Sequence, residues 1–199
     1  MPTIHAFGPE AWLVDDLTDP AAWAAGLEEI DVEGVEEIVP AEASVLVVAR
    51  RDRADEVGHR LTEVTSRPRR TGDVPIEISV TYDGDDLGAV AEFIGGTVDE
   101  VVRLHSETEY RVAFCGFSPG FAYLSGLPER LHLPRRDSPR VRVPAGSVAI
   151  AAHYSAIYPS PSPGGWHLLG RTDDVVWDVH RHPPTRLRPG TGVRFVVHR

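Results

Sequence analysis

Residues 110–126, YRVAFCGFSPGFAYLSG, are the stretch where one pattern of apolar residues replaces another. The helical spacing of the preceding residues ends there, and short runs of β-branched and aromatic residues follow, separated by loops rich in Gly and Pro. Short strands at this spacing are typical of a closed or nearly closed β-barrel. The strands that we expect are 110–117, 147–152, 166–169, 175–179 and 193–197.

The residues before this stretch are expected to add one strand and two helices to the barrel unit. Residues 75–82 alternate apolar and polar side chains, which is the two-residue period of a strand. A helix is predicted over 86–94, where a glycine pair ends it. The S/T-x-x-E capping box that begins at Thr97 opens a second helix through Ser106. We therefore predict a C-terminal β-barrel domain over residues 75–199.

Residues 1–66 are expected to form a small α+β domain of their own. The expected elements, in order, are strands 3–7 and 11–14, a helix 20–30, strands 35–39 and 44–49, and a helix 52–64. Asp19 followed by Pro20 supports the first helix, because Asp is a favoured N-cap and Pro fits the first turn. The order ββαββα predicts a small sheet covered by two helices. The breaker-rich segment 67–73 is the predicted domain boundary, and the fold class is α+β.

The composition is that of an ordinary globular protein, with 42% hydrophobic and 25% charged residues over 199 positions. No apolar run approaches the ~20 residues that a membrane-spanning helix needs, and the N-terminus lacks the features of a secretory signal. Cys115 is the one cysteine, which excludes an internal disulfide and favours a reducing compartment. We therefore expect a cytoplasmic protein with no membrane partner.

Charge is distributed unevenly along the chain. Residues 1–49 contain 11 acidic and no basic residues, whereas residues 110–199 contain 12 arginines and 5 acidic residues. The acidic front half argues against nucleic-acid binding, because that binding depends on cations that contact phosphates. The basic back half suits a small anionic ligand or an acidic partner surface, or it only neutralises the front half. All 20 basic residues are arginines, so the chain has neither a lysine Schiff base nor a P-loop.

Three features resemble catalytic or metal-binding motifs, but each is incomplete. Residues 116–120, GFSPG, match the G-x-S-x-G nucleophile elbow, yet Pro119 has no backbone N–H for an oxyanion and no helical pattern follows. We expect a rigid loop with aromatic flanks instead. Cys115 lies in an apolar strand, where a free cysteine is usually a small core residue. His180 and His182 share the spacing of two ligands on one strand face, but no third ligand fits, so no bound metal is predicted.

The richest segment in candidate binding residues is PRRDSPRVRVPAGS (134–147). Its prolines stiffen the chain and favour extended backbone, in which Arg140 and Arg142 point to one face. Val141 and Val143 point to the other face and are expected to anchor the segment in the barrel. Arg140 would then project outward with little core contact. Arginine forks bind carboxylate or phosphate groups bidentately, and the alternative is a solvated charged edge that protects a barrel strand.

Several motifs in one order resemble a known family. They are GFSPGFAYL (116–124), PRRDSPRVRVPAGSV (134–148), IYP (157–159), SPGGW (162–166) and GRT (170–172). Together they resemble the KipI / allophanate hydrolase subunit 1 family, which is also described as the B-subunit of the prokaryotic ATP-dependent 5-oxoprolinase (PxpB-like). The resemblance is dense over residues 75–199, whereas over 1–66 only the order of elements matches.

The resemblance implies a small α+β domain, a C-terminal cyclophilin-like β-barrel, and a cytoplasmic complex with two other proteins. One partner, the C-subunit, is similar to KipA or allophanate hydrolase subunit 2, and the other, the A-subunit, is similar to LamB/YcsF. Together they open the 5-oxoproline lactam to L-glutamate with ATP as co-substrate, through phosphorylation of the amide oxygen and then ring hydrolysis. This chain alone would be inactive, since it lacks a P-loop, a lysine and a complete set of nucleophile, base and orienting group.

Other members of the family have other roles, which leaves two alternatives. One is a regulatory binding protein that inhibits a sensor histidine kinase, as KipI does. The other is a carboxyltransferase-type subunit that acts on a urea-like amide. Prolyl isomerisation by analogy with the barrel rests on the fold alone.

We predict two sets of site residues and assign no catalytic residue. The substrate- or anion-binding set is Arg136, Arg140, Ser147 and His105. The loop residues predicted to line a pocket are Phe117, Pro119, Gly120, Phe121, Tyr154 and Trp166. For His105, which continues the apolar stripe of its helix, a role as a core residue stays open.

The sequence departs from the family at residues 149–156, AIAAHYSA, where the family usually reads G-I-A-G-x-Q-T-G. Tyr154 stands in place of Gln and Ser155 in place of Thr. Loss of an amide and gain of a ring beside the pocket can alter the ligand. Ala152 and Ala156 stand in place of glycines, and alanine is expected to exclude the positive φ that glycine allows.

Overall fold

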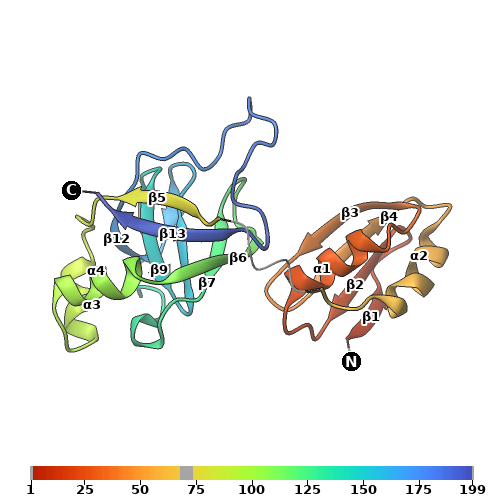
Figure 1. Ribbon diagram of the computed structural model, residues 1–199, viewed down its shortest axis with the longest axis horizontal. Helices are drawn as coiled ribbons and strands as arrows, with labels where there is room; N and C mark the ends of the chain where they lie inside the picture. Colours follow the sequence, from red (N-terminus) through yellow and green to blue (C-terminus); the bar gives the residue numbers. More distant parts are fainter. Residues whose placement is uncertain (1, 68–73, 199) are drawn as a thin grey trace. The chain divides into compact units, whose positions relative to one another are not determined.

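The computed structural model describes residues 2–67 and 74–198, and the chain divides into two compact units, Met1–Gly72 and Asp73–Arg199. Figure 1 shows the elements of both units, and each unit has a hydrophobic core of its own. Most of the predicted boundary segment, 67–73, lies outside the described residues. No helix of the two described ranges has the length and apolar character needed to cross a membrane.

The N-terminal unit is an antiparallel sheet with two helices. Its elements are β1 (Thr3–Ala6), β2 (Ala11–Asp15), α1 (Pro20–Glu29), β3 (Val35–Pro40), β4 (Val45–Ala49), α2 (Ala54–Arg60) and a 3₁₀ turn (Leu61–Glu63). The strands lie in the order β1-β2-β4-β3. The carboxylate of Asp19 accepts a hydrogen bond from the backbone N–H of Ala22 at 2.9 Å and so caps α1, as predicted. The ββαββα order is confirmed, and α2 is shorter than expected because its last turn is 3₁₀.

The C-terminal unit is a nearly closed barrel with two helices beside it (Figure 1). Its strands are β5 (Ile76–Val80), β6 (Glu109–Cys115), β7 (Ala122–Ser125), β8 (Arg140–Val143), β9 (Ser147–Ala151), β10 (Tyr154–Ile157), β11 (Ser162–Gly164), β12 (His167–Arg171) and β13 (Gly192–Val197). Its helices are α3 (Leu87–Phe93), α4 (Val98–Ser106) and a 3₁₀ turn (Glu129–Leu131). The barrel order is β12-β9-β10-β7-β6-β13-β5. Two backbone hydrogen bonds of 2.9 Å between Thr81 and Arg171 join its ends, so the predicted α+β class with a barrel is confirmed.

Strand β9 is buried on both faces, and this places the candidate site. Val148 and Ile150 belong to the core inside the barrel, whereas Ala149 and Ala151 belong to a second cluster that is rich in aromatic residues. Val143 of β8 joins that second cluster, and β8 pairs with β11 as a separate two-stranded sheet. The second cluster therefore covers the face of β9 that points away from the barrel interior.

Two expectations about the barrel unit are wrong. Residues 175–179 are not a strand but part of the long connection between β12 and β13, in which Trp177 makes an isolated bridge to Thr185. The edge that such a strand would need is used where β12 meets Thr81, so Val175 and Val179 stay exposed. Strands β7, β8, β10 and β11 were not expected, because they have only three or four residues between Gly and Pro.

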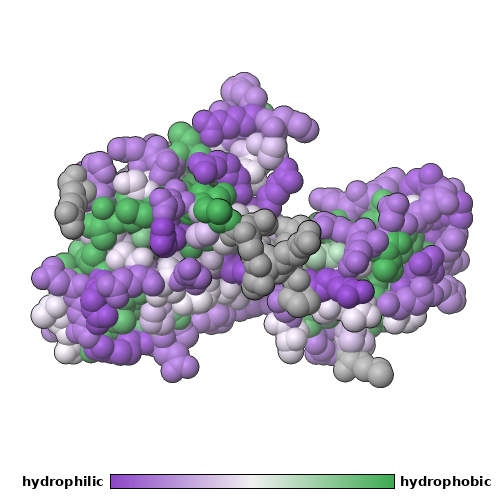
Figure 2. Space-filling view, viewed as in Figure 1, coloured by the Kyte–Doolittle hydropathy of each residue, from purple (hydrophilic) through white to green (hydrophobic). Residues whose placement is uncertain are grey.

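Figure 2 shows no large apolar face on the visible side of the described residues. Hydrophilic side chains cover most of the visible area of both units, with smaller hydrophobic areas among them. The large exposed apolar side chains are spread over several elements and include Phe7, Phe93, Phe117, Val141 and Val179. Single exposed apolar residues are normal on soluble proteins, so the search for a site turns to hollows rather than patches.

Candidate functional site

An aromatic pocket lies where the predicted loops meet over the second cluster. Its volume is about 100 Å³, and its walls are mainly aromatic rings and glycine backbone. The residues that line it are Phe117, Phe121, Tyr123, Arg135, Tyr158, Gly164, Gly165 and Trp166. Three of them, Phe117, Phe121 and Trp166, are among the loop residues predicted from the sequence. The other five lie inside the same motifs, so the motifs indicate the right loops without indicating which side chains face the hollow.

Phe121 is the centre of the ring packing. Its ring makes edge-to-face contacts, with centroid distances of 5.1 Å to Tyr123, 5.2 Å to Tyr158, 5.2 Å to Phe117 and 5.5 Å to Trp166. Such contacts add about 0.5–1.5 kcal/mol per pair beyond the burial of area. Phe121, Tyr158 and Trp166 are almost fully buried, whereas Phe117 is 61% exposed at the rim. The pocket therefore has closely packed aromatic walls and one exposed ring at its edge.

The loop 116–121 holds Phe117 in a rare conformation. Phe117 has a φ of 67°, which is uncommon for a bulky residue and costs roughly 1–2 kcal/mol. Gly120 has a φ of 81°, and a Cβ there would overlap the side chain of Trp177. Backbone hydrogen bonds within the loop, such as Phe121 N–H to the Ser118 carbonyl at 3.0 Å, fix its shape. Strand β7 follows the loop, so a loop with aromatic flanks is confirmed and a nucleophile elbow, which needs a helix there, is excluded.

The SPGGW motif forms the opposite wall. A Cβ at Gly164 would overlap the hydroxyl of Tyr158, so only glycine lets β11 approach that ring. Gly165 has more room, because the nearest atom to a Cβ there lies at 3.6 Å. The backbone carbonyl of Gly165 accepts the N–H of Arg136 at 2.8 Å, which ties this wall to the arginine segment.

Arg136 and Arg140 both bind the carboxylate of Asp86. The Nη2 of Arg140 lies 2.9 Å from Asp86 Oδ1, Arg136 Nη1 also donates to that oxygen, and the backbone N–H of Leu168 donates to Oδ2 at 2.7 Å. Asp86 is 3% exposed. Its burial acts to raise the pKa of the carboxyl, but the hydrogen bonds from Arg140 and Leu168 and the charges of both arginines outweigh it, so the pKa is lowered.

This ion-pair cluster corrects two expectations about the arginine segment. Arg140 does not project outward with little contact, because its side chain is mostly buried against Asp86. Val141 does not anchor the segment, since it is 91% exposed while Val143 is fully buried. The register of the β8–β11 pair shifts between Arg140 and Val143, which breaks the two-residue alternation and leaves Val141 and Arg142 exposed between them. In this structure, the anion held by Arg136 and Arg140 is Asp86 rather than a ligand.

Arg135 is the arginine that faces the pocket. It lines the hollow and is exposed, and within residues 2–67 and 74–198 no carboxylate forms an ion pair with it. Its charge also acts on Tyr158. Burial raises the pKa of the Tyr158 hydroxyl, and the nearby charge of Arg135 acts in the opposite direction. Arg135, which no sequence pattern singled out, is therefore the cation available to a ligand at this site.

Buried polar atoms without partners gather in the segments that build the pocket. Among the described residues, those in the barrel unit are Ser118 Oγ, Arg136 Nε, Arg140 Nη1, Ser162 Oγ and His167 Nδ1. All five come from the stretches 116–121, 134–147 and 162–167. An unsatisfied buried polar group is rare and calls for an explanation such as water or a bound ligand. None of these five residues lines the pocket, so their unpaired atoms lie in its supporting segments rather than at its surface.

His105 lies in the barrel core, away from solvent. Tyr82 Oη lies 2.7 Å from Nδ1 and Ser155 Oγ lies 2.8 Å from Nε2, and the ring stacks on Phe195 with centroids 4.5 Å apart. Burial lowers the pKa of His105 to about 3. An anion would find neither a path nor a positive charge there, so His105 is removed from the anion-binding set and is a satisfied core residue.

The remaining predicted site residues have other surroundings. Ser147 is buried at the start of β9, where its carbonyl accepts the N–H of Tyr158 at 2.9 Å. Tyr154 does not line the pocket but lies behind Tyr123, with ring centroids 5.5 Å apart. Pro119 is exposed on the loop and Gly120 is buried beneath it. These residues shape or support the pocket walls rather than face its interior.

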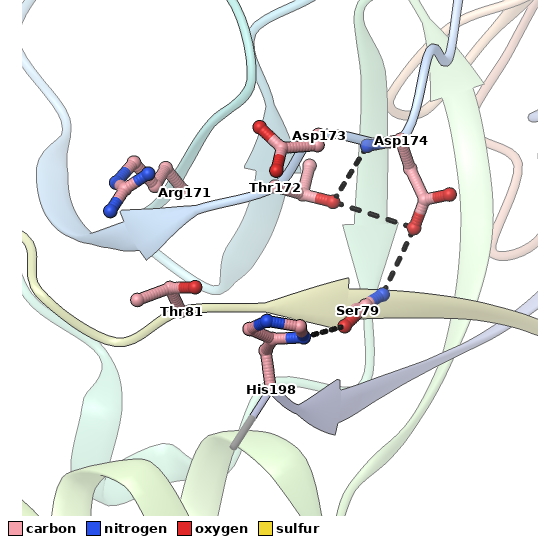
Figure 3. A pocket seen from close by; sticks show the side chains of 7 residues that line it. All are labelled: Ser79, Thr81, Arg171, Thr172, Asp173, Asp174 and His198. Carbon is pink, nitrogen blue, oxygen red and sulfur yellow. Dashed lines mark hydrogen bonds between the residues drawn. The ribbon is translucent and has the colours of Figure 1, made fainter.

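A second hollow of about 220 Å³ lies where the barrel closes, and it gathers polar residues (Figure 3). Ser79 Oγ lies 3.3 Å from His198 Nδ1, and Asp174 Oδ2 accepts the backbone N–H of Ser79 at 3.0 Å. No carboxylate in the described part of the chain bonds to the ring of His198, so a hydrolytic triad is not formed. The hydroxyl of Thr172 donates a hydrogen bond to Asp174, and Arg171 pairs with Thr81 where the barrel closes. The GRT motif therefore contributes to barrel closure.

Cys115 is poorly suited to act as a nucleophile. Its thiol donates to the carbonyl of Leu187 at 3.4 Å, and burial raises the pKa of the thiol. The thiolate is the reactive form of cysteine, so a raised pKa disfavours attack on a substrate. Among the described residues, no nucleophile is paired with a base beside the pocket. The residues that line the pocket are suited to bind a small ring and an anion.

Comparison with known proteins gives the relatives of this chain. A family described as the carboxyltransferase domain, subdomain C and D, matches residues 2–187. The 5-oxoprolinase B-subunit from Escherichia coli O157:H7 is 41% identical over 181 residues, which are 87% of this chain and 83% of that protein. The protein of the same name from Haemophilus influenzae is 48% identical over 125 residues, 61% of this chain and 59% of that protein.

The solved structures agree with the fold. The crystal structure of TTHA0988 superposes with a TM-score of 0.83 at 34% identity, over 99% of this chain. This chain spans only 40% of the length of TTHA0988. The urea carboxylase of Kluyveromyces lactis shares the fold with a TM-score of 0.70 at 17% identity, over 100% of this chain and 22% of that enzyme.

Proposed function

The chain belongs to the carboxyltransferase domain C and D family, and from this premise we propose that it is the B-subunit of an ATP-dependent 5-oxoprolinase complex. The observation that carries the proposal is the match to the 5-oxoprolinase B-subunit of Escherichia coli O157:H7 along 83% of that protein. Three relatives at 41–48% identity have the same name, so the kinase-inhibitor and urea-type alternatives are not favoured.

The proposed reaction opens the lactam of 5-oxoproline to L-glutamate. ATP transfers its terminal phosphoryl group to the amide oxygen and leaves as ADP, and one water adds to the activated ring carbon. The C–N bond then breaks to free the amine of γ-glutamyl phosphate, and a second water hydrolyses this acyl phosphate to glutamate and phosphate. The partners are the KipA-like barrel protein and the LamB/YcsF-like protein. We place the complex in the cytoplasm, where the single thiol of Cys115 stays reduced.

The part of this chain in that reaction is binding and positioning. Its aromatic pocket of about 100 Å³ is smaller than the ~300–1,000 Å³ of ordinary cofactor sites, so we expect ATP to bind elsewhere in the complex. Burial raises the pKa of the Cys115 thiol and lowers the pKa of the His105 imidazole, so it favours the uncharged form of both groups. The bond-breaking groups are therefore expected from the partners.

Reconstitution from purified proteins tests the proposal. The KipA-like and LamB/YcsF-like partners mixed with this chain should convert 5-oxoproline to glutamate and consume ATP, whereas this chain alone should do neither. The three proteins should also co-elute on a size-exclusion column. Failure of the full mixture to form glutamate, with all three proteins folded, would overturn the proposed function.

A further inference from the structure

We propose that the aromatic pocket binds a small planar ring that carries a carboxylate, with the ring against Phe117 and Tyr123 and the carboxylate on Arg135. The inference rests on the proposed function, because 5-oxoproline is a nearly planar lactam with one carboxylate. It adds that the substrate-recognition site lies in this chain and that Arg135, rather than Arg136 or Arg140, binds the anion.

The size and walls of the pocket suit a single ring. A hollow of about 100 Å³ accommodates a ring of five or six atoms but not a nucleoside triphosphate. Phe117 and Tyr123 carry the accessible aromatic surface of the pocket, and the almost fully buried Phe121 and Trp166 pack against these rings. Gly164 and Gly165 keep one wall free of side chains. Phe117 stands exposed at the rim, where its ring can contact the outer face of a bound ligand.

The charges single out Arg135. Arg136 and Arg140 share the carboxylate of Asp86, and Arg140 also lies 3.8 Å from Asp85, so a ligand would have to displace an internal partner. Arg135 lines the pocket with no such partner among the described residues. A guanidinium binds a carboxylate through two parallel hydrogen bonds, which also fixes the orientation of the ring.

Calorimetric titration of the full chain with two probes tests the inference. 5-Oxoproline has the ring and the carboxylate, whereas 2-pyrrolidinone has the same lactam ring without the carboxylate. Arg135→Ala should weaken binding of 5-oxoproline at least tenfold, because it removes a charge-assisted pair, and should leave 2-pyrrolidinone binding unchanged. Arg142→Ala is the matched control, since Arg142 is an exposed arginine of the same segment outside the pocket lining, and it should change neither affinity.

A second readout in the assembled complex separates this inference from the proposed function. Arg135→Ala should raise the KM for 5-oxoproline at least tenfold with a smaller change in kcat. An active complex with an unchanged KM, or a folded chain that binds 5-oxoproline equally well with and without Arg135, would overturn the inference and leave the proposed function standing. An inactive wild-type complex beside a chain that binds as expected would overturn the function but not the pocket.

Discussion

At the scale of one residue, Arg140 has a structural role that the sequence pattern does not predict, because its partner Asp86 is distant in the sequence. The sequence pattern places it on the exposed face of a stiff segment, where its loss would hardly affect stability. The structure places its guanidinium 2.9 Å from the carboxylate of Asp86, which is almost fully buried. Asp86 lies 54 residues earlier in the chain, so no local pattern predicts the pair.

Arg140→Ala is therefore expected to lower the free energy of unfolding by about 1–3 kcal/mol, because a hydrogen bond to a charged group is lost and Asp86 keeps only Arg136 as a cation. Urea denaturation monitored by circular dichroism measures the change. Arg142→Ala, in the exposed part of the same strand, should stay within about 0.5 kcal/mol of the wild type. Equal stability of the two variants would show that the pair with Asp86 contributes nothing.

His105 makes the stability of the barrel depend on pH. In the unfolded chain, a histidine binds a proton below about pH 6.5, whereas the folded protein keeps His105 neutral down to a pKa of about 3. Between these values the unfolded state holds more protons, so stability is full above pH 6.5 and is lost as the pH falls. One proton corresponds to a slope of about 1.4 kcal/mol per pH unit.

Urea titrations at pH 7 and pH 5 measure this slope. The wild type should lose more stability between the two values than His105→Gln, which cannot take up the proton, although the variant is less stable at pH 7. The other histidines contribute equally to both proteins and cancel in the comparison. The same loss in both would contradict a neutral, buried His105.

Ala152 corrects the expectation that alanine excludes a positive φ. It adopts a φ of 50° directly after β9, at the turn into β10. This conformation costs an alanine roughly 1–2 kcal/mol, and glycine adopts it without that cost but with more freedom in the unfolded chain. Ala152→Gly should therefore raise the midpoint of thermal unfolding slightly, with a gain of about 0.5–1 kcal/mol.

The matched control is Ala156→Gly in the extended, buried strand β10, where the same change should lower stability by about 1 kcal/mol. Differential scanning calorimetry compares the two. A fall in the melting temperature of Ala152→Gly would mean that the methyl group of Ala152 contributes more than its backbone costs.

At the scale of elements, the sequence predicts the helices and strands that have a regular spacing of apolar residues or a recognisable capping residue. Helix α1 follows from Asp19 and Pro20, and β5 from its alternation, because local chemistry determines both. The strands β8 and β11 have only three or four residues, and they pair with one another across the segment that contains β9 and β10. The apolar run 175–179 has strand-like residues but no free edge to pair with, so tertiary context overrides its propensity.

The glycine wall of β11 gives an element-scale prediction. Gly164→Ala should destabilise the barrel unit and distort the pocket, because its Cβ would overlap the Tyr158 hydroxyl. Gly165→Ala, with 3.6 Å to its nearest atom, should be tolerated. The pair Gly164→Ala with Tyr158→Phe should recover part of the lost melting temperature. Equal melting temperatures for the two single alanine variants would mean that β11 moves aside freely.

At the scale of the whole molecule, the α+β class, the barrel and the family could be predicted from the sequence, since the motifs share one order. The loops that build the site were predicted correctly, whereas only some of the predicted side chains line it. Phe117, Phe121 and Trp166 line the pocket as expected, but Arg135 does so in place of Arg136 and Arg140. Which of three nearby arginines is free depends on the position of Asp86, and only the folded chain shows that.

The proposed function makes this chain an obligatory member of a 5-oxoprolinase complex. The most direct measurement is the rate of ATP-dependent glutamate formation by fixed amounts of the KipA-like and LamB/YcsF-like partners as this chain is added. The predicted result is no glutamate without the chain and a rate that rises with it and then saturates at a fixed stoichiometry. Glutamate formation at the same rate with and without the chain would contradict that obligatory role.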